Sequence, residues 1–341
     1  MRFNHLLKYR QAWLGIALLW VMFFHCPFEF GPLNYLRRIG YGGVDICLFA
    51  SGIGCFYSLS SEPNIIHFMK RRVKRLVPTY IIFIIAWLFW QYTIGDFNLQ
   101  MALGNLLALQ NLTGHGNAFN WYISAIFVLY ILAPYFKIVA QQASTTRKIA
   151  FLLFLIISSI PFWNAGTYLI TITRFPVFYI GMLFADLCNK NKQIEKIHVI
   201  CMITTFLLGI GFLLFSFAFA YDYMWGYGLY WYPFILIAPP LCMIISFVCM
   251  VLEKAKLTKP MVTFLHLCGN YSFELYLIHI PLFDIIPMII EKCNLSNCVY
   301  WVWGAMCIVC LPVGCFMLRY LATLLSRFCS TMQHKQSKHL S

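Results

Sequence analysis

Long apolar runs alternate with short polar segments along almost the whole chain, and the polar segments are rich in lysine and arginine. A helix needs about 20 predominantly apolar residues to cross the hydrocarbon core of a bilayer. The pattern shows neither heptads nor the internal repeat typical of transporters. Runs of sufficient size predict ten membrane-spanning helices, over 9–28, 43–60, 78–95, 121–137, 148–162, 174–188, 197–219, 231–252, 264–287 and 299–326.

A further apolar piece over 99–112 is short and runs into a turn-forming segment, 111–117. We expect it to be re-entrant or interfacial rather than spanning. Lysine and arginine gather on the cytoplasmic side of membrane proteins. With ten spans and a cytoplasmic N-terminus, 20 of the 25 basic residues fall on that inner side. Counting 99–112 as a span would break this pattern for every later loop, so we predict that both termini are cytoplasmic.

The composition agrees with a membrane protein and excludes two other classes. Hydrophobic residues make up 61% of the 341 positions and charged residues only 11%, whereas a soluble domain carries about 25% charged residues. A soluble enzyme and a disordered chain are therefore excluded. The net charge of +14 would suit a nucleic-acid-binding protein, but its division among inner loops indicates membrane topology instead. We expect an all-α polytopic protein with one transmembrane domain over 1–326 and a basic cytoplasmic tail over 327–341, disordered from Ser330.

Most of the 14 cysteines lie inside apolar runs, where cysteine behaves as a small hydrophobic residue. Cys293 and Cys298 differ, because they flank a polar loop that the predicted topology places outside the cell. An oxidising compartment would allow these two thiols to pair. A disulfide and two free thiols are equally compatible with the sequence.

Ionisable residues inside predicted spans are costly and are therefore candidates for function. His25 ends the first span and Asp45 lies near the start of the second, which runs in the opposite direction. Both side chains are expected near the outer surface, and Gly42 and Gly43 allow the two helices to approach closely. A carboxylate beside an imidazole fixes its tautomer and supports the cation formed on proton uptake. The pattern predicts a catalytic pair; the alternative is an interfacial histidine and a helix-capping aspartate.

A second cluster lies on the predicted inner side, where residues 70–75 read Lys-Arg-Arg-Val-Lys-Arg. Guanidinium groups bind phosphate well, so Arg71, Arg72 and Arg75 are candidates for holding a nucleotide-type ligand. The alternative is contact with anionic lipid heads, since basic residues belong on this side in any case. Arg174 is unusual in its position, because it begins a span on the predicted outer side, where the positive-inside rule expects few basic residues.

Glu274 and His279 place two further ionisable residues in the predicted ninth span. They are five residues apart and therefore do not share one face of a helix, which requires a spacing of three or four. His279 is compatible with a hydrogen-bonded packing role as well as with a functional one.

Six short motifs occur in a particular order along nearly the whole chain. They are the histidine ending span one (His25); Gly-Val-Asp and Ser-Gly in span two (Gly43, Val44, Asp45, Ser51, Gly52); the basic stretch ending in Arg-Leu-x-Pro-x-Tyr (75–80); Trp-Tyr before a span that ends in Pro-Tyr (Trp121, Tyr122, Pro134, Tyr135); Arg-Phe-Pro with a following glycine (Arg174, Phe175, Pro176, Gly181); and Tyr-Ser-x-x-Leu-Tyr-Leu-Ile-His (271–279). In this order the motifs resemble the integral-membrane acyltransferase-3 family, bacterial enzymes that O-acylate cell-envelope glycans.

The resemblance implies that an acyl group passes from a coenzyme A thioester in the cytoplasm to a hydroxyl on the far side. From Gln11 to His25 a helix rises about 21 Å, which is similar to the length of an extended pantetheine arm. His25 would deprotonate the acceptor hydroxyl. A mechanism through a covalent acyl-enzyme intermediate remains an alternative. The resemblance assigns His25 and Asp45 to catalysis, Arg71, Arg72 and Arg75 to the donor, and Arg174, Trp121, Tyr122, Glu274 and His279 to substrate binding.

The chain departs from the family pattern at two places. Many members carry an arginine eleven positions before the histidine of span one, where this chain has Leu14. The nearest arginine is Arg10, one helical turn earlier, so the role of that arginine is either lost or shifted. The paired phenylalanines that follow the aspartate in the family are Cys47 and Leu48 here.

Two other function classes remain open on the sequence alone. A transporter or flippase of an envelope precursor would use the buried charges for substrate passage, although the broken helix pairs typical of transporters are absent. A membrane sensor without catalysis is the third. For the acyltransferase we expect acetyl-CoA as donor, a surface glycan or lipid-linked saccharide as acceptor, contacts with membrane lipids, no metal, no nucleic acid, and a location in the bacterial cytoplasmic membrane.

Overall fold

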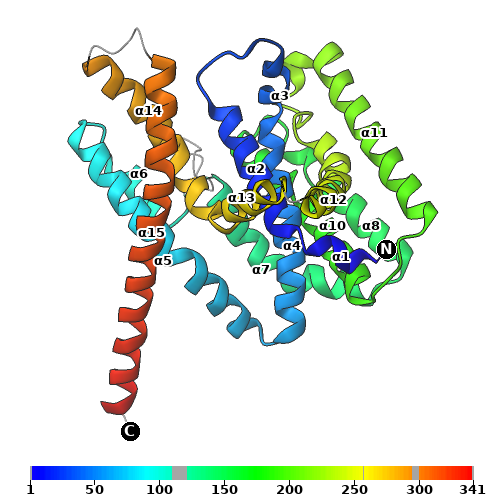
Figure 1. The fold of residues 1–341 in the computed structure, drawn as a ribbon. Helices are drawn as coiled ribbons and strands as arrows, with labels where there is room; N and C mark the ends of the chain where they lie inside the picture. Colours follow the sequence, from blue (N-terminus) through cyan, green and yellow to red (C-terminus); the bar gives the residue numbers. More distant parts are fainter. Residues whose placement is uncertain (1, 110–120, 256, 294–298, 340–341) are drawn as a thin grey trace.

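The computed structural model consists of helices packed into a bundle, with no β-strand among the residues that it describes (Figure 1). These residues are 2–109, 121–255, 257–293 and 299–339, with side chains described up to residue 329. The helices are α1 (Phe3–Leu7), α2 (Arg10–His25), α3 (Asn34–Arg38), α4 (Gly43–Ser61), α5 (Ile65–Thr93), α6 (Leu99–Leu106), α7 (Trp121–Gln142), α8 (Thr145–Ile157), α9 (Thr167–Ile172), α10 (Phe175–Asn189), α11 (Lys196–Phe219), α12 (Tyr232–Lys254), α13 (Lys259–Asn270), α14 (Ser272–Lys292) and α15 (Val299–His339).

The helices confirm a multi-pass, all-α membrane fold. Nine helical segments within the described residues are long and apolar enough to cross a membrane. The 16-residue α2 is shorter than these nine, but at 1.5 Å per residue it is still about 24 Å long, and it lies inside the bundle (Figure 1). The eight-residue α6 is too short to span the membrane, in agreement with the expectation for residues 99–109. Residues 110–112 of that apolar piece lie outside the described residues. Cys298 also lies outside them, so the pairing of Cys293 with Cys298 stays open.

The ends of the helices separate into two sets (Figure 1). The links from α2 to α3 and from α11 to α12 lie at one end of the bundle, together with the C-terminal end of α14. The link from α4 to α5 and the C-terminal end of α15 lie toward the opposite end. These predicted outer and inner segments therefore lie toward opposite ends of the molecule, as alternate crossing of a membrane requires.

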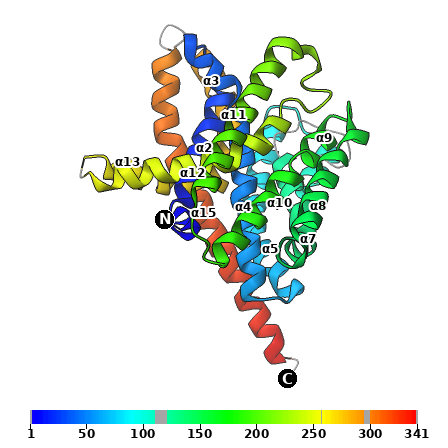
Figure 2. The ribbon, with the colours of Figure 1, turned by 90° about the vertical axis from the view of Figure 1, so that its right-hand side faces the viewer.

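Two predicted spans have different boundaries in the structure. The basic segment 70–75 is not a loop but part of α5, which begins at a cap where the Asn64 side chain accepts a hydrogen bond from the backbone of His67 at 3.1 Å. The predicted span 264–287 is divided at Tyr271 into α13 and α14. α13 projects sideways from the bundle (Figure 2), so only α14 belongs to the crossing.

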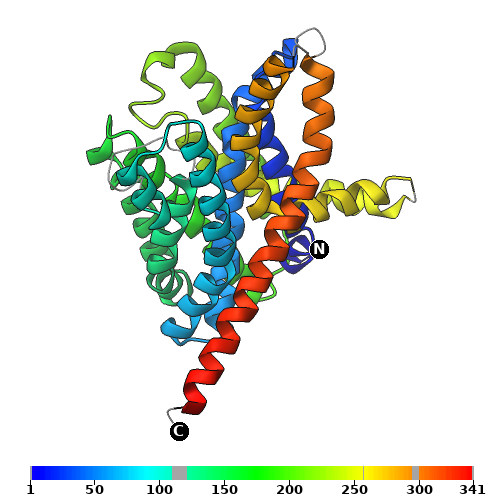
Figure 3. The same ribbon diagram turned by 90° about the vertical axis from the view of Figure 1, so that its left-hand side faces the viewer.

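The expected disorder of the C-terminal tail is wrong as far as His339. α15 continues to that residue without a break and extends well past the other helices (Figure 3). The physical reason is local, because the chain contains no glycine or proline after Gly314 to stop the helix.

Glycines bring α2, α4 and α10 into direct backbone contact. A Cβ added to Gly43 would lie 2.3 Å from the carbonyl oxygen of Ala17 on α2, and one added to Gly52 would lie 2.1 Å from that of Phe178 on α10. No larger residue fits at either position without moving a helix. The close approach of the first two predicted spans is therefore present, and α4 is held tightly between its two neighbours.

Candidate active site

An internal cavity of about 60 Å³ lies between α2, α4, α5, α7 and α14. Arg10, Leu14, Leu18 and Val21 line it from α2. Their spacing of three or four residues places them along one face of that helix, so the cavity follows α2 from its N-terminal turn outward. His25 is the next position along the same face, four residues beyond Val21.

The face of α14 that lines the cavity leads in the same direction. Ser272, Phe273 and Tyr276 contribute to the wall, and His279 follows Tyr276 after three residues, on the same side of the helix. The rings of His25 and His279 have their centroids 5.3 Å apart. Two helices that line the cavity therefore each carry a histidine about one turn beyond their last lining residue, Val21 on α2 and Tyr276 on α14.

Arginines gather at the other end of the cavity. Arg10 donates to the carbonyl oxygen of Ala50 through both Nε and Nη2, at 3.1 and 2.9 Å. Arg72 is buried and donates through Nη2 to the carbonyl oxygen of Gly54 at 3.0 Å. Arg75 also lines the cavity and is exposed. Three guanidinium groups thus face one small space beside α4.

The arginines that line the cavity differ by one residue from the predicted donor-binding set. Arg71 is exposed and points away from the cavity, with Nη2 donating to the carbonyl oxygen of Ser58 at 3.0 Å. Arg10 takes its place in the set. The signal for Arg10 was already in the sequence, because it lies one helical turn before Leu14 and therefore on the same face.

The predicted contact between His25 and Asp45 is wrong. Asp45 is fully buried, and its one charged partner among the described residues is Arg174, with Oδ1 3.7 Å from Nε. The reason is the path of the link between α2 and α4, which turns back along α2: Trp20 Nε1 donates to the carbonyl oxygen of Leu36 at 2.9 Å. α4 therefore begins beside the middle of α2, and Asp45 lies more than one helical turn deeper than His25.

Arg174 lies at the start of α10 between two tryptophans. Its guanidinium carbon is 4.7 Å from the ring centroid of Trp121 and 5.2 Å from that of Trp231. Nη1 donates to the carbonyl oxygen of Ile170 at 2.8 Å. The pairing of Arg174 with Trp121 joins two predicted substrate-binding residues, whereas Trp231 was not among the predicted site residues.

The remaining predicted site residues divide between the cavity and a different contact. Tyr122 lines the cavity, and its ring centroid is 5.0 Å from that of Tyr276. Glu274 instead accepts hydrogen bonds from Arg319 of α15, at 2.8 Å from Nε and 2.7 Å from Nη2. Glu274 therefore joins α14 to α15 and does not line the cavity.

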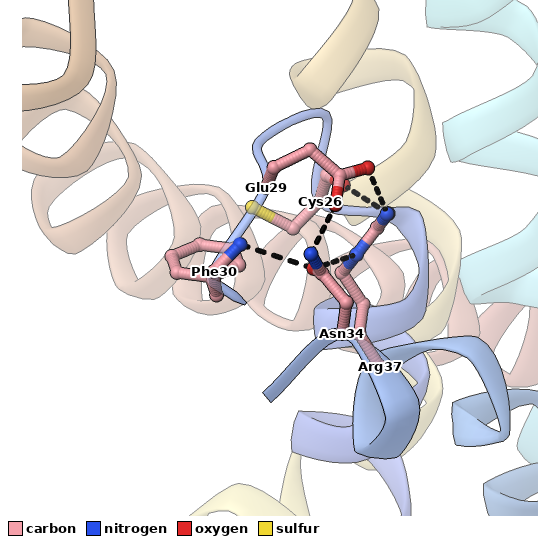
Figure 4. Close-up of polar contacts among 5 residues, drawn as sticks. All are labelled: Cys26, Glu29, Phe30, Asn34 and Arg37. Carbon is pink, nitrogen blue, oxygen red and sulfur yellow. Dashed lines mark hydrogen bonds and ion pairs between the residues drawn. The ribbon is translucent and has the colours of Figure 1, made fainter. Parts of the chain in front are cut away.

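The segment that follows His25 is held by a small polar network on the outer side (Figure 4). Arg37 donates to the carbonyl oxygen of Cys26 at 3.0 Å and to the Glu29 carboxylate at 2.9 Å. Its Nε also donates to Asn34 Oδ1 at 3.2 Å. These bonds fix the backbone directly after His25 and give a role to one of the few basic residues on the predicted outer side.

The family model for an acyltransferase domain, acyltransferase-3, matches residues 15–318. The chain belongs to the acyltransferase-3 family. The matched region contains both histidines at the outer end of the cavity and two of its three arginines, while Arg10 precedes it. The resemblance inferred from the six motifs is confirmed. Neither the curated proteins nor the solved structures contained a match to the chain.

Proposed function

We propose that this acyltransferase moves an acyl group, with acetyl as the expected case, from cytoplasmic acyl-CoA to a hydroxyl of an extracytoplasmic glycan or lipid-linked sugar. In this proposal ten helices, α2 included, cross the bacterial cytoplasmic membrane, and both termini are cytoplasmic. The observation that carries the proposal is the cavity. Its inner end has three guanidinium groups, and its walls on α2 and α14 lead to His25 and His279.

The three arginines suit the phosphates of coenzyme A. Guanidinium groups form charge-assisted, often bidentate hydrogen bonds with phosphate. Nε of Arg72 is buried and has no hydrogen-bond partner among the described residues, so it has a donor left for such a ligand. Arg75 is exposed and would meet the nucleotide first. Lys70, Arg71 and Lys74 are exposed away from the cavity and suit anionic lipid heads.

The apolar wall of α2 suits the pantetheine arm. Between Arg10 and Val21 the helix rises about 17 Å, and Leu14 and Leu18 line the cavity between them. A narrow passage with this apolar wall would admit an extended arm and a small acyl group while excluding bulk water. The nucleotide would remain at the arginines while the thioester approaches His25.

His25 supplies the chemistry in this scheme. It is exposed at the outer end of α2, where an acceptor can reach it. The imidazole takes the proton of the acceptor hydroxyl as the oxygen attacks the thioester carbonyl. A carbon–oxygen bond forms, the carbon–sulfur bond breaks, and the leaving coenzyme A thiolate takes the proton from His25.

Aromatic side chains on the outer side suit a sugar acceptor. Trp225 and Tyr223 are exposed, and the ring of Trp225 lies 5.3 Å from that of the buried Trp231. Trp231 in turn lies against Arg174. Flat apolar surfaces therefore lie at the same end of the molecule as the link that follows His25 (Figure 1), while Arg174 is buried and faces Asp45.

The test is release of coenzyme A thiol from radiolabelled acetyl-CoA by purified protein, with an envelope extract as the source of acceptor. We expect thiol release and label transfer with the wild-type protein, and loss of both with His25→Ala, although this variant inserts and purifies normally. A transporter or a sensor would neither release thiol nor transfer label. Full turnover by His25→Ala would contradict the mechanism.

A further inference from the structure

His279 is the buried histidine at the outer end of the cavity. Its side chain is fully buried, and Nδ1 lies 2.9 Å from the carbonyl oxygen of Leu275. A carbonyl oxygen only accepts hydrogen bonds, so Nδ1 must carry the proton and donate it. In the neutral ring Nε2 then has a free lone pair and can only accept.

Nε2 of His279 has no hydrogen-bond partner among the described residues. A buried polar atom without a partner is destabilising, and such atoms are rare enough to require an explanation. The rings packed around His279 are those of His25, Tyr276 and Phe283, with centroids 5.3, 5.9 and 5.9 Å away. His25 and Tyr276 carry an N–H or O–H that can donate a hydrogen bond, and the ring of His25 is the nearer of the two.

His25 needs a group that orients its ring, and Asp45 does not supply it. Asp45 is deeper in the bundle and faces Arg174. With ring centroids 5.3 Å apart, two ring nitrogens that point at one another would fall within the range of about 2.7–3.2 Å that a hydrogen bond needs. His279 is therefore placed to do what the sequence assigned to Asp45.

We propose that Nε2 of His279 accepts a hydrogen bond from a ring N–H of His25 and thereby positions it. This inference rests on the proposed function. The other nitrogen of His25 is then left unprotonated and directed at the acceptor hydroxyl. When His25 takes up the proton, His279 supports the cation as a neutral acceptor and does not itself touch the substrate. It is a positioning residue, and its partner Leu275 holds it in the required tautomer.

Two substitutions separate this role from packing. His279→Gln has an amide oxygen that reaches the place of Nε2, whereas the shorter His279→Asn replaces only the donor at Nδ1. We expect His279→Asn to lower kcat for thiol release from acetyl-CoA at least tenfold with an unchanged KM, and His279→Gln to recover most of that loss. His266→Asn on α13 is the matched control and should behave like the wild type.

The outcomes that overturn the inference differ from those that overturn the proposed function. Wild-type rates in both variants would mean that Nε2 has no role. Equal losses in both, or losses shared between kcat and KM, would mean that His279 serves packing. Either result alongside an active wild-type protein and an inactive His25→Ala variant overturns the inference alone, whereas a wild-type protein that releases no thiol overturns the proposed function and this inference with it.

Discussion

Arg10 lies one helical turn before the position at which many acyltransferase-3 proteins carry an arginine. Its guanidinium nevertheless faces the same cavity as Leu14, which occupies that position. An arginine side chain is long enough to deliver its charge to the next turn of a helix, so the function of the missing arginine is shifted rather than lost in this account.

We expect Arg10→Gln to raise the apparent KM for acetyl-CoA about tenfold or more. The substitution removes a charge-assisted hydrogen bond to a phosphate, worth about 1.5–3 kcal/mol, and 1.4 kcal/mol corresponds to a factor of ten. Steady-state kinetics of thiol release measure it. Arg71→Gln is the control, since Arg71 lies outside the cavity and should leave the KM almost unchanged. The opposite ranking would assign the cavity to another ligand.

The buried ion pair between Asp45 and Arg174 leads to a prediction about stability. Removing one partner of a buried ion pair leaves an uncompensated charge and costs about 3–5 kcal/mol, whereas removing both costs far less. We expect Asp45→Asn and Arg174→Gln each to lower the unfolding temperature in detergent, and the double variant to recover much of that loss. If Asp45→Asn unfolds like the wild type yet loses all turnover, Asp45 acts directly in catalysis.

The sequence located two of the three cavity-facing arginines but not their partners. Arg71 and Arg72 are four and three residues from Arg75, so helical spacing brings either of them to its face, and only the packing of α5 on α4 separates them. The partner of His25 depends on the depth at which α4 begins. That depth follows from the way the link between α2 and α4 packs against Trp20. The periodicity of apolar residues does not predict this packing.

At the scale of helices, the crossings depend on a few glycines. We expect Gly52→Ala to destabilise the protein by about 1–3 kcal/mol, as overpacking does, because a Cβ there meets a carbonyl oxygen of α10 at 2.1 Å. Gly211→Ala on α11 is the control. No atom lies within 4 Å of its added Cβ, so the higher helix propensity of alanine should leave stability unchanged or slightly raised. Equal effects on thermal unfolding would contradict the close crossing.

Helix boundaries follow local signals that hydropathy alone does not always detect. The prediction that 99–112 does not span is confirmed as far as residue 109, because α6 has only eight residues. The division between α13 and α14 falls at Tyr271, directly after Gly269 and Asn270, which are helix-ending residues inside a run that hydropathy reads as one span. Asn64 caps the start of α5, so this helix includes the basic residues that precede its apolar half. Hydropathy alone assigns those basic residues to a loop.

For the whole molecule, the account makes one central claim: the donor enters from the inner end and the acyl group leaves at the outer end. The two ends differ as this requires, with cavity-facing arginines at one and two histidines with aromatic side chains at the other. The charge distribution along the sequence assigns the arginine end to the cytoplasm. The claim therefore concerns direction across the membrane as well as chemistry.

Sealed membrane vesicles of the two orientations test that claim most directly. Radiolabelled acetyl-CoA, which does not cross the bilayer, is added to the outside of inverted vesicles and of right-side-out vesicles from the same cells. The account predicts transfer of label to glycan inside the inverted vesicles, none in the sealed right-side-out vesicles until they are opened, and none with His25→Ala in either. Equal transfer by sealed right-side-out vesicles would contradict it.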